Sequence, residues 1–183
     1  SSINNVGFIL IGLATATADG ASAMLVYLAI YVAMTIGGFV AVLMLKDADG
    51  NPVEAIADLA GLSRERKVLA ASLAVIMFSL AGIPPMLGFW GKLVVFQAAV
   101  KAGMFPVAVL GVLGSVVGAF YYLKVVKVMY FDEPAGKALG KSDWVHQAIL
   151  ALCVLFVSPL GYLVVKCLTA LAGLAVAALL PVA

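Results

Sequence analysis

The sequence predicts an all-α, polytopic transmembrane helix bundle that contains a discontinuous (broken) helix. Three observations predict this fold class. Hydrophobic residues make up 65% of the 183 residues and charged residues only 11%, which excludes a soluble globular domain. The charged residues are concentrated between long apolar runs. One of these runs is longer than a bilayer requires and carries two adjacent prolines near its centre.

Two spans are expected before the first polar loop. Residues 3–17 form a short apolar segment that ends in the turn-like cluster 15–20. Residues 24–45 form a full-length span, with Tyr31 and Thr35 at helical spacing on its polar, small-residue side. That side is expected to face other helices. A water-lined route past Tyr31 and Thr35 is the alternative.

Residues 68–100 are expected to be the broken helix. As one helix, the apolar part of this run would extend about 46 Å, whereas a bilayer core of about 30 Å needs only about 20 residues. Pro84 and Pro85 each remove a helix N–H, and Pro85 also disfavours the helical conformation at Pro84. The run should therefore divide into two half-helices, with a break at residues 82–86 that begins at Gly82. Such irregular backbone is tolerated at membrane depth only where protein or water surrounds it, as in transporters.

Lys92 lies near the middle of the second half-helix, where Gln97 is the other strongly polar residue. An unpaired ammonium at the bilayer centre costs about 2.5–3.5 kcal/mol, so the side chain should face the bundle interior or water. Removal from water disfavours the charged form, which would let Lys92 take up and release a proton. The half-helix ends around Gly82 and Gly88 would offer backbone polar groups to ordered water. The alternative is that Lys92 reaches an interface as a topological anchor.

The fourth span is expected at residues 105–130. Gly114 and Gly118 have the GxxxG spacing that permits close helix contact. Near the end of this span, Tyr122 belongs to an aromatic group typical of a membrane interface. Lys124 is close enough to that end for its ammonium to reach the interface, and a buried relay group is the alternative.

A fifth span is expected at residues 145–165. Apolar residues continue over 166–180, too far for one straight helix. This tail is expected to lie along the interface or to fold back.

The distribution of charge predicts the orientation of the chain. The basic regions 46–67 and 124–141 fall on one face, whereas the turns at Asp19 and Lys101 fall on the other. By the positive-inside rule, the basic face is cytoplasmic. The formal net charge of only +2 implies no nucleic-acid partner.

A metal or iron–sulfur site is not expected. Cys153 and Cys167 are the only cysteines, they form no CxxC pair, and His146 is the only histidine. A disulfide is not expected either. No Asp or Glu lies inside an expected span, so an acidic partner for Lys92 is not expected within this chain.

The residues around the break resemble a known family. The segments 79–85 (SLAGIPP) and 88–92 (GFWGK) are similar to the hallmark of the antiporter-like membrane subunits of respiratory complex I. Residues 1–8, 56–62 and 119–124 extend this resemblance over nearly the whole chain.

Within that family the chain is most similar to subunit N of bacterial NADH–quinone oxidoreductase, called subunit 2 in mitochondrial naming. The sister subunits L and M, and related sodium/proton antiporter subunits, typically carry a histidine and lysine motif in the span equivalent to residues 24–45. Residues 31–39 (YVAMTIGGF) contain neither residue. This departure favours subunit N.

The resemblance implies a fold of about fourteen helices with two inverted repeats, each with a broken helix. Residues 1–183 would be a single transmembrane domain that forms the C-terminal portion of this fold. The start of the chain, SSINN, without an initiator methionine or a charged n-region, is also expected of part of a longer polypeptide. By the same resemblance, Lys92 is the proton-channel lysine of the second repeat.

The implied function is proton translocation in a bacterial inner (cytoplasmic) membrane, coupled to quinone reduction. The chain would be an enzyme subunit without a redox centre. NADH, FMN, iron–sulfur clusters and quinone would be bound by partner subunits. The expected partners are the other membrane subunits of complex I, the N-terminal part of the same subunit, the lipid bilayer and protons. The alternatives are a membrane subunit of a cation/proton antiporter or membrane-bound hydrogenase, or a structural scaffold with an inert Lys92.

Overall fold

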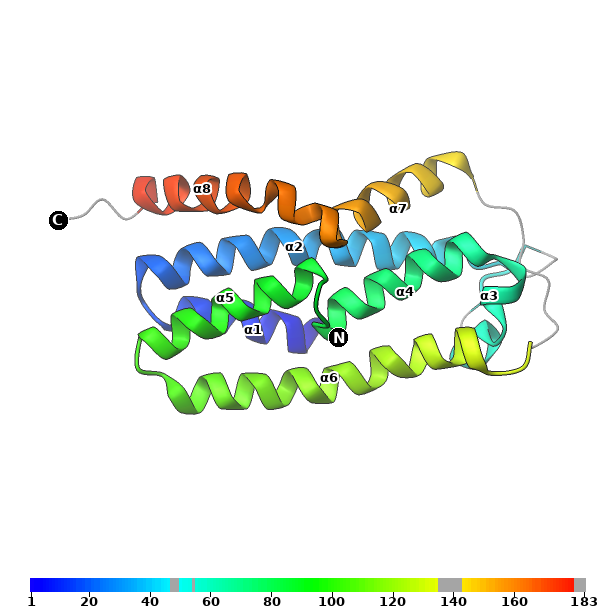
Figure 1. Ribbon diagram of the computed structural model, residues 1–183, viewed down its shortest axis with the longest axis horizontal. Coiled ribbons are helices and arrows are strands. Elements are labelled where there is room, and N and C mark those ends of the chain that lie inside the picture. Colours follow the sequence, from blue (N-terminus) through cyan, green and yellow to red (C-terminus); the bar gives the residue numbers. More distant parts are fainter. Residues whose placement is uncertain (47–49, 54, 135–142, 180–183) are drawn as a thin grey trace.

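The computed structural model describes the chain except residues 47–49, 54, 135–142 and 180–183. Within the described part, the regular structure is helical and the longer helices run along the long axis of an elongated bundle (Figure 1). The elements are α1 (Ser2–Ala14), α2 (Ala18–Leu43), η1 (Ile56–Leu59), α3 (Leu62–Glu65), α4 (Lys67–Ala81), α5 (Leu87–Lys101), α6 (Phe105–Phe131), α7 (Trp144–Val157), η2 (Pro159–Gly161) and α8 (Tyr162–Leu179).

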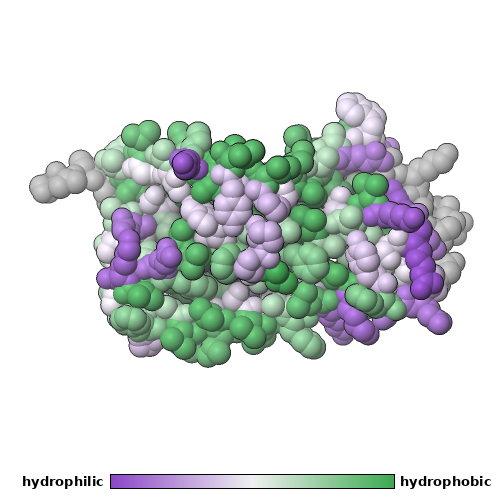
Figure 2. Space-filling view, in the orientation of Figure 1, coloured by the Kyte–Doolittle hydropathy of each residue, from purple (hydrophilic) through white to green (hydrophobic). Residues whose placement is uncertain are grey.

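Three helical segments are long and apolar enough to cross a membrane, namely α2, α6 and Pro159–Leu179. Three shorter apolar helices, α1, α4 and α7, accompany them. Strongly hydrophilic residues gather mainly toward the two ends of the bundle, and the surface between them is largely hydrophobic, with a weakly hydrophilic patch near the centre of this face (Figure 2). The predicted all-α, polytopic membrane bundle is therefore confirmed.

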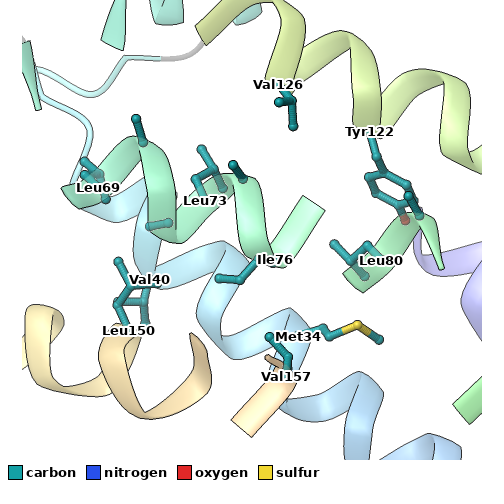
Figure 3. Packing of buried hydrophobic residues seen from close by; sticks show 14 of the residues in the cluster. Met34, Val40, Leu69, Leu73, Ile76, Leu80, Tyr122, Val126, Leu150 and Val157 are labelled. Carbon is teal, nitrogen blue, oxygen red and sulfur yellow. The ribbon is translucent and has the colours of Figure 1, made fainter. Parts of the chain in front are cut away.

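The core surrounds α2, which contributes the buried residue Met34. Ile76 of α4, Val126 of α6, and Leu150 and Val157 of α7 belong to the same buried cluster (Figure 3). Lipid is as apolar as these side chains, so close packing, rather than removal of apolar surface from water, is what holds such helices together. In contrast, the outer face of α6 is exposed and apolar, with Phe120 75% exposed.

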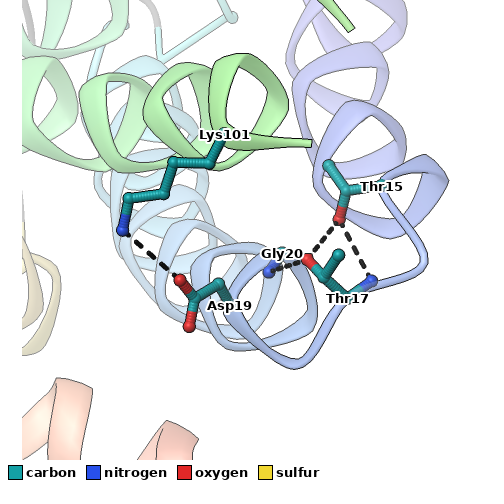
Figure 4. Close-up of polar contacts among 5 residues, drawn as sticks. All are labelled: Thr15, Thr17, Asp19, Gly20 and Lys101. Atoms are coloured by element: carbon teal, nitrogen blue, oxygen red, sulfur yellow. Dashed lines mark hydrogen bonds and ion pairs between the residues drawn. The ribbon is translucent and has the colours of Figure 1, made fainter. Parts of the chain in front are cut away.

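The first turn is tighter than expected. The helix α2 begins at Ala18, before the expected residue 24, because the hydroxyl of Thr17 accepts a hydrogen bond from the N–H of Gly20 at 3.0 Å and caps the helix (Figure 4). Asp19 lies in the first helical turn rather than in a loop, where its carboxylate faces the positive end of the helix dipole.

An ion pair joins Asp19 to Lys101 at 3.4 Å (Figure 4). It connects the α1–α2 turn to the C-terminal end of α5, so the two turns expected on one face do lie at the same end of the bundle. Both side chains are 72% exposed. Exposed pairs of this kind contribute at most about 1 kcal/mol to stability.

The last part of the chain differs from the expectation of one span at 145–165 and a separate tail. The helix α7 ends at Val157, because Ser158 is extended and Pro159 has no N–H to continue the helix. The next helix, α8, extends to Leu179 and packs along α2, continuing the line of α7 (Figure 1). The apolar residues 166–179 are therefore part of a packed helix, and Leu180 lies outside the described residues.

The loop after α2 contains two short helical elements, the 3-10 turn η1 and the single-turn helix α3. Glu54 lies outside the described residues, as do Lys137 and Lys141 of the second basic region. The loop begins and ends at the bundle end opposite the Asp19–Lys101 pair (Figure 1).

Candidate functional site at the broken helix

The break between α4 and α5 begins at Gly82. This residue has φ +80°, a left-handed conformation that strongly favours glycine. The N–H groups of Gly82 and Ile83 both donate to the carbonyl of Phe78, at 3.1 and 3.0 Å. These bonds form a Schellman-type C-cap that ends α4 at Ala81. The helix α5 begins at Leu87, so the interruption covers the segment that contains Pro84 and Pro85.

The break leaves the carbonyl of Leu80 without its helical donor. In a continuous helix the N–H of residue 84 would donate to it, and Pro84 has no N–H. The ammonium of Lys92 donates to this carbonyl instead, with Nζ 2.8 Å from the oxygen. The C-terminal end of α4 also carries the negative end of the helix dipole, which favours a cation there.

The start of α5 is held directly against the end of α4. The N–H of Gly88 donates to the hydroxyl of the fully buried Ser79 at 3.0 Å. A Cβ at residue 88 would lie 2.1 Å from the carbonyl oxygen of Ser79, so this approach requires glycine. Ser79 and Gly88 therefore fix where Lys92 stands relative to the Leu80 carbonyl.

Lys92 is only 3% exposed. Its Nζ also donates to Ser115 Oγ of α6 at 3.2 Å and lies 4.9 Å from the centre of the Phe8 ring of α1. None of the ion pairs within the described part of the chain involves Lys92, so its contacts are with neutral groups. The lysine therefore faces the bundle interior, and the geometry does not fit an anchor that reaches the interface.

A cavity of about 390 Å³ reaches this lysine. Lys92 and Ser115 are the polar side chains on its wall, Gly82 forms part of its edge, and the rest of the lining is apolar. A Cβ at residue 82 would lie 3.2 Å from Lys92 Cδ and 3.3 Å from Nζ. Glycine at position 82 therefore leaves room for the lysine as well as ending α4.

A second buried polar cluster lies beyond Phe8. The Tyr27 hydroxyl donates to Asn5 Oδ1 at 2.8 Å, and Asn5 Nδ2 donates to the Tyr122 hydroxyl at 3.0 Å. The ring of Phe8 packs edge-on against Tyr27, with ring centroids 6.0 Å apart. Tyr122 is 4% exposed, so the expectation that it belongs to an interfacial aromatic belt is wrong. Its hydroxyl is satisfied inside the bundle by Asn5, which makes burial favourable.

The other residues predicted for a proton route lie apart from Lys92. Tyr31 stacks on Tyr27, with ring centroids 6.4 Å apart, and lines a groove of about 230 Å³ together with Thr35. Lys124 is exposed on α6. The structure thus brings Lys92 together with Gly82 but not with Tyr31, Thr35 or Lys124.

Sequence reasoning missed Ser115, Phe8 and Asn5. A serine inside an otherwise apolar span was the available signal for Ser115. Its register against Lys92, however, depends on how α5 and α6 cross. The free carbonyl of Leu80 could have been predicted from the sequence, because Pro84 has no N–H to donate to it.

The described residues offer no metal site. In these ranges no three His, Cys, Asp or Glu side chains come together. Cys153 and Cys167 are free thiols.

Comparison with known proteins identifies relatives. A family model described as NADH:quinone oxidoreductase/Mrp antiporter, transmembrane, matches residues 1–118. The chain is 60% identical to NADH-quinone oxidoreductase subunit N of Erythrobacter litoralis, over 98% of this chain and 37% of that protein. It is 54% identical to the subunit N of Rhizorhabdus wittichii, over 93% of this chain and 36% of that protein. The chain thus spans little more than a third of the length of these curated relatives.

Solved structures show the same fold. A chain of respiratory complex I from Thermus thermophilus matches with a TM-score of 0.71 and 31% identity, over 87% of this chain and 36% of that chain. A chain of the Mrp complex from Dietzia sp. matches with a TM-score of 0.75 over 94% of this chain and 40% of that chain. At 22% identity the second match shows the fold alone. The chain belongs to the NADH:quinone oxidoreductase/Mrp antiporter transmembrane family, in which it is similar to the C-terminal part of subunit N.

Proposed function

We propose that this chain is the C-terminal part of a proton-translocating subunit N of NADH–quinone oxidoreductase, with Lys92 as the proton carrier. One observation supports the proposal most strongly. A lysine that is 3% exposed sits at a helix break and is held by neutral groups. Burying an ionisable group in a membrane span costs free energy, and such groups usually mark ion or proton pathways.

The contacts of Lys92 suit a group that changes protonation state. Burial disfavours the ammonium, whereas the Leu80 carbonyl, the α4 dipole and the Phe8 ring stabilise it. None of these neutral neighbours carries a charge that would hold Lys92 in one protonation state. A buried carboxylate partner would instead hold the lysine charged.

Ser115 can form a hydrogen bond with both the charged and the neutral form of Lys92. Its hydroxyl accepts a hydrogen bond from the ammonium at 3.2 Å, and a hydroxyl can equally donate to the lone pair of a neutral amine. The Leu80 carbonyl can only accept. Ser115 therefore allows Lys92 to lose its proton without losing that partner.

The cavity beside Lys92 is the proposed approach for a water molecule that delivers or removes the proton. Tyr31, Thr35 and Lys124 remain proposed contributors to the route, although none contacts Lys92. Tyr31 is connected to this region indirectly, through Tyr27 and Phe8.

The redox chemistry is assigned to partners of this chain. NADH, FMN, iron–sulfur clusters and quinone would be bound by other subunits of the complex, and their electron transfer would drive proton transfer at Lys92 from a distance. The other membrane subunits, the N-terminal part of the same subunit and the bilayer of a bacterial inner membrane are the proposed surroundings. The chain would therefore be part of an enzyme without holding its redox centres.

The relatives named subunit N favour this function over a subunit of a cation/proton antiporter or membrane-bound hydrogenase. The discriminating experiment is copurification. Flavin and iron–sulfur subunits that oxidise NADH should accompany the full-length protein. Copurification of small membrane proteins alone would favour the antiporter.

The test of Lys92 is NADH-driven proton uptake in inverted membrane vesicles that carry Lys92→Ala in the full-length subunit. The matched control is Lys101→Ala, which removes an exposed lysine from the same helix. Proton uptake per electron should fall in the first variant and stay at the parental value in the control, with both complexes assembled. Unchanged uptake in Lys92→Ala would favour an inert lysine in a scaffold.

A further inference from the structure

The largest cavity among those described lies away from Lys92, between the start of α4 and α7, and has a volume of about 710 Å³. Its lining residues include Met44 and residues 64–69. They place it at the end of the bundle where α2 ends and α4 begins, which is opposite the end that holds the α1–α2 turn (Figure 1). This is the end predicted to be cytoplasmic. We call this cavity the α4–α7 groove, and its lining combines cationic with apolar side chains.

Three cationic side chains and one carboxylate line the groove: Arg64, Arg66, Lys67 and Glu65. Arg66 is positioned by the protein, because its Nη1 donates to the carbonyl of Met44 at the C-cap of α2, at 3.1 Å. Arg64 and Lys67 are exposed, and neither takes part in an ion pair among the described residues. The groove thus presents an excess of positive charge at the point where a chain segment enters the membrane.

The remaining wall is apolar. Val68 is 82% exposed directly after Lys67, while Leu69 and Leu150 are buried at the base of the groove. Trp144, 78% exposed, begins α7 at the same end, as expected of an aromatic side chain at a membrane interface. A ligand that fits must therefore carry negative charge at one end and hydrocarbon at the other.

We propose that the α4–α7 groove binds an anionic phospholipid. Its phosphate would lie between Arg64 and Lys67, and an acyl chain would follow Val68 toward the bilayer centre. Basic pockets between membrane helices on the cytoplasmic side suit such head groups, and arginine pairs with phosphate through two parallel hydrogen bonds. The proposal depends on the membrane family of this chain and is independent of the role of Lys92.

The test uses the intact complex, reconstituted in nanodiscs of phosphatidylcholine with a small fraction of photoreactive phosphatidylglycerol. After illumination, labelled peptides are located by mass spectrometry. The test variant is the double substitution Arg64→Gln and Lys67→Gln. The matched control is Lys46→Gln with Lys127→Gln, which removes two positive charges from the same end of the bundle but outside the groove.

Crosslinks should concentrate on residues 64–72 and 147–151 in the parent and control complexes. The apparent affinity should fall about thirtyfold in the double variant, since each of the two cations near an anionic head group strengthens binding roughly fivefold. Competition with inorganic phosphate should leave the crosslinks unchanged, because a free anion lacks the acyl chain.

Three results would overturn the proposal. Equal labelling by a photoreactive phosphatidylcholine would show that the positive charges of the groove do not favour anionic lipids. Loss of labelling with inorganic phosphate would identify a simple anion site. Absence of labelling by any lipid in the assembled parent complex would show that protein covers the groove.

Discussion

Replacing Gly82 by alanine should disturb Lys92 and destabilise the break at the same time. At φ +80° an L residue pays about 1–2 kcal/mol of backbone strain. In addition, the new Cβ would lie 3.2 Å from Lys92 Cδ and 3.3 Å from Nζ, closer than ordinary van der Waals contact. The lysine must therefore move by a few tenths of an ångström. That shift is enough to stretch the 3.2 Å contact with Ser115 to the limit of a hydrogen bond, near about 3.5 Å.

The chain provides a matched control for the strain alone. Gly103 has φ +75° in the turn before α6, and a Cβ there would meet nothing within 4 Å. Gly82→Ala and Gly103→Ala should therefore lose similar stability, measured as the temperature at which the complex dissociates in detergent. Only Gly82→Ala should slow proton transfer, by about tenfold or more, because a hydrogen bond to a charged group contributes about 1.5–3 kcal/mol.

The assay is proton uptake per electron in vesicles that hold the assembled complex, with NADH oxidation recorded in parallel. Equal uptake in the two alanine variants would refute the reasoning, because it would show that the space beside Lys92 has no bearing on proton transfer. A large difference in stability between the two variants would refute the second claim, that the positive φ shared by Gly82 and Gly103 accounts for most of the lost stability.

Substitutions at three further positions test the geometry of the site. Gly88→Ala would place a Cβ 2.1 Å from the Ser79 carbonyl oxygen, so the ends of α4 and α5 must separate, at a cost of about 3 kcal/mol or more, and a native gel should show little assembled complex. Ser115→Ala should lower proton uptake per electron in an assembled complex. Ser115→Thr keeps the hydroxyl and should retain much of the parental uptake. Equal uptake in both variants would show that the Ser115 hydroxyl has no part in proton transfer. Tyr27→Phe leaves Asn5 Oδ1 without its donor and should lower stability by about 1–3 kcal/mol, read from thermal dissociation of the complex, with proton uptake per electron unchanged.

The position of the break followed directly from the sequence. Two adjacent prolines forbid helical hydrogen bonds whatever the tertiary context, and a glycine just before them supplies a C-cap. These are local properties, so Gly82 and the prolines were sufficient to predict where α4 ends. The burial of Lys92 was one of the two outcomes expected from the sequence, because the cost of placing an ammonium in lipid leaves the bundle interior or an interface.

The partners of Lys92 did not follow from the sequence. Ser115 and Phe8 approach it from two other helices, α6 and α1, and their register depends on how the helices cross. The wrong expectation for Tyr122 has the same cause. An aromatic side chain near a span end is usually interfacial, but here Asn5 of α1 satisfies its hydroxyl inside the bundle.

The division of the C-terminal region was also only partly predictable. Pro159 was visible, but a single proline often only kinks a membrane helix, because neighbouring groups satisfy the freed carbonyl. In this chain the extended Ser158 precedes it, and the interruption becomes a full turn of 3-10 helix. The packing of α8 along α2 then places the apolar tail in the bundle. Hydropathy alone does not predict this contact between helices that are far apart in the sequence.

The most direct test of the central claim, that Lys92 exchanges protons, is the number of protons pumped per electron in a complex that carries Lys92→Arg. Arginine keeps the positive charge but stays protonated at all working pH values. If Lys92 is the proton carrier, an assembled Lys92→Arg complex will pump no better than Lys92→Ala. If Lys92→Arg pumps like the parent complex, a fixed positive charge at the break is sufficient, and the proton-carrier role of Lys92 is contradicted.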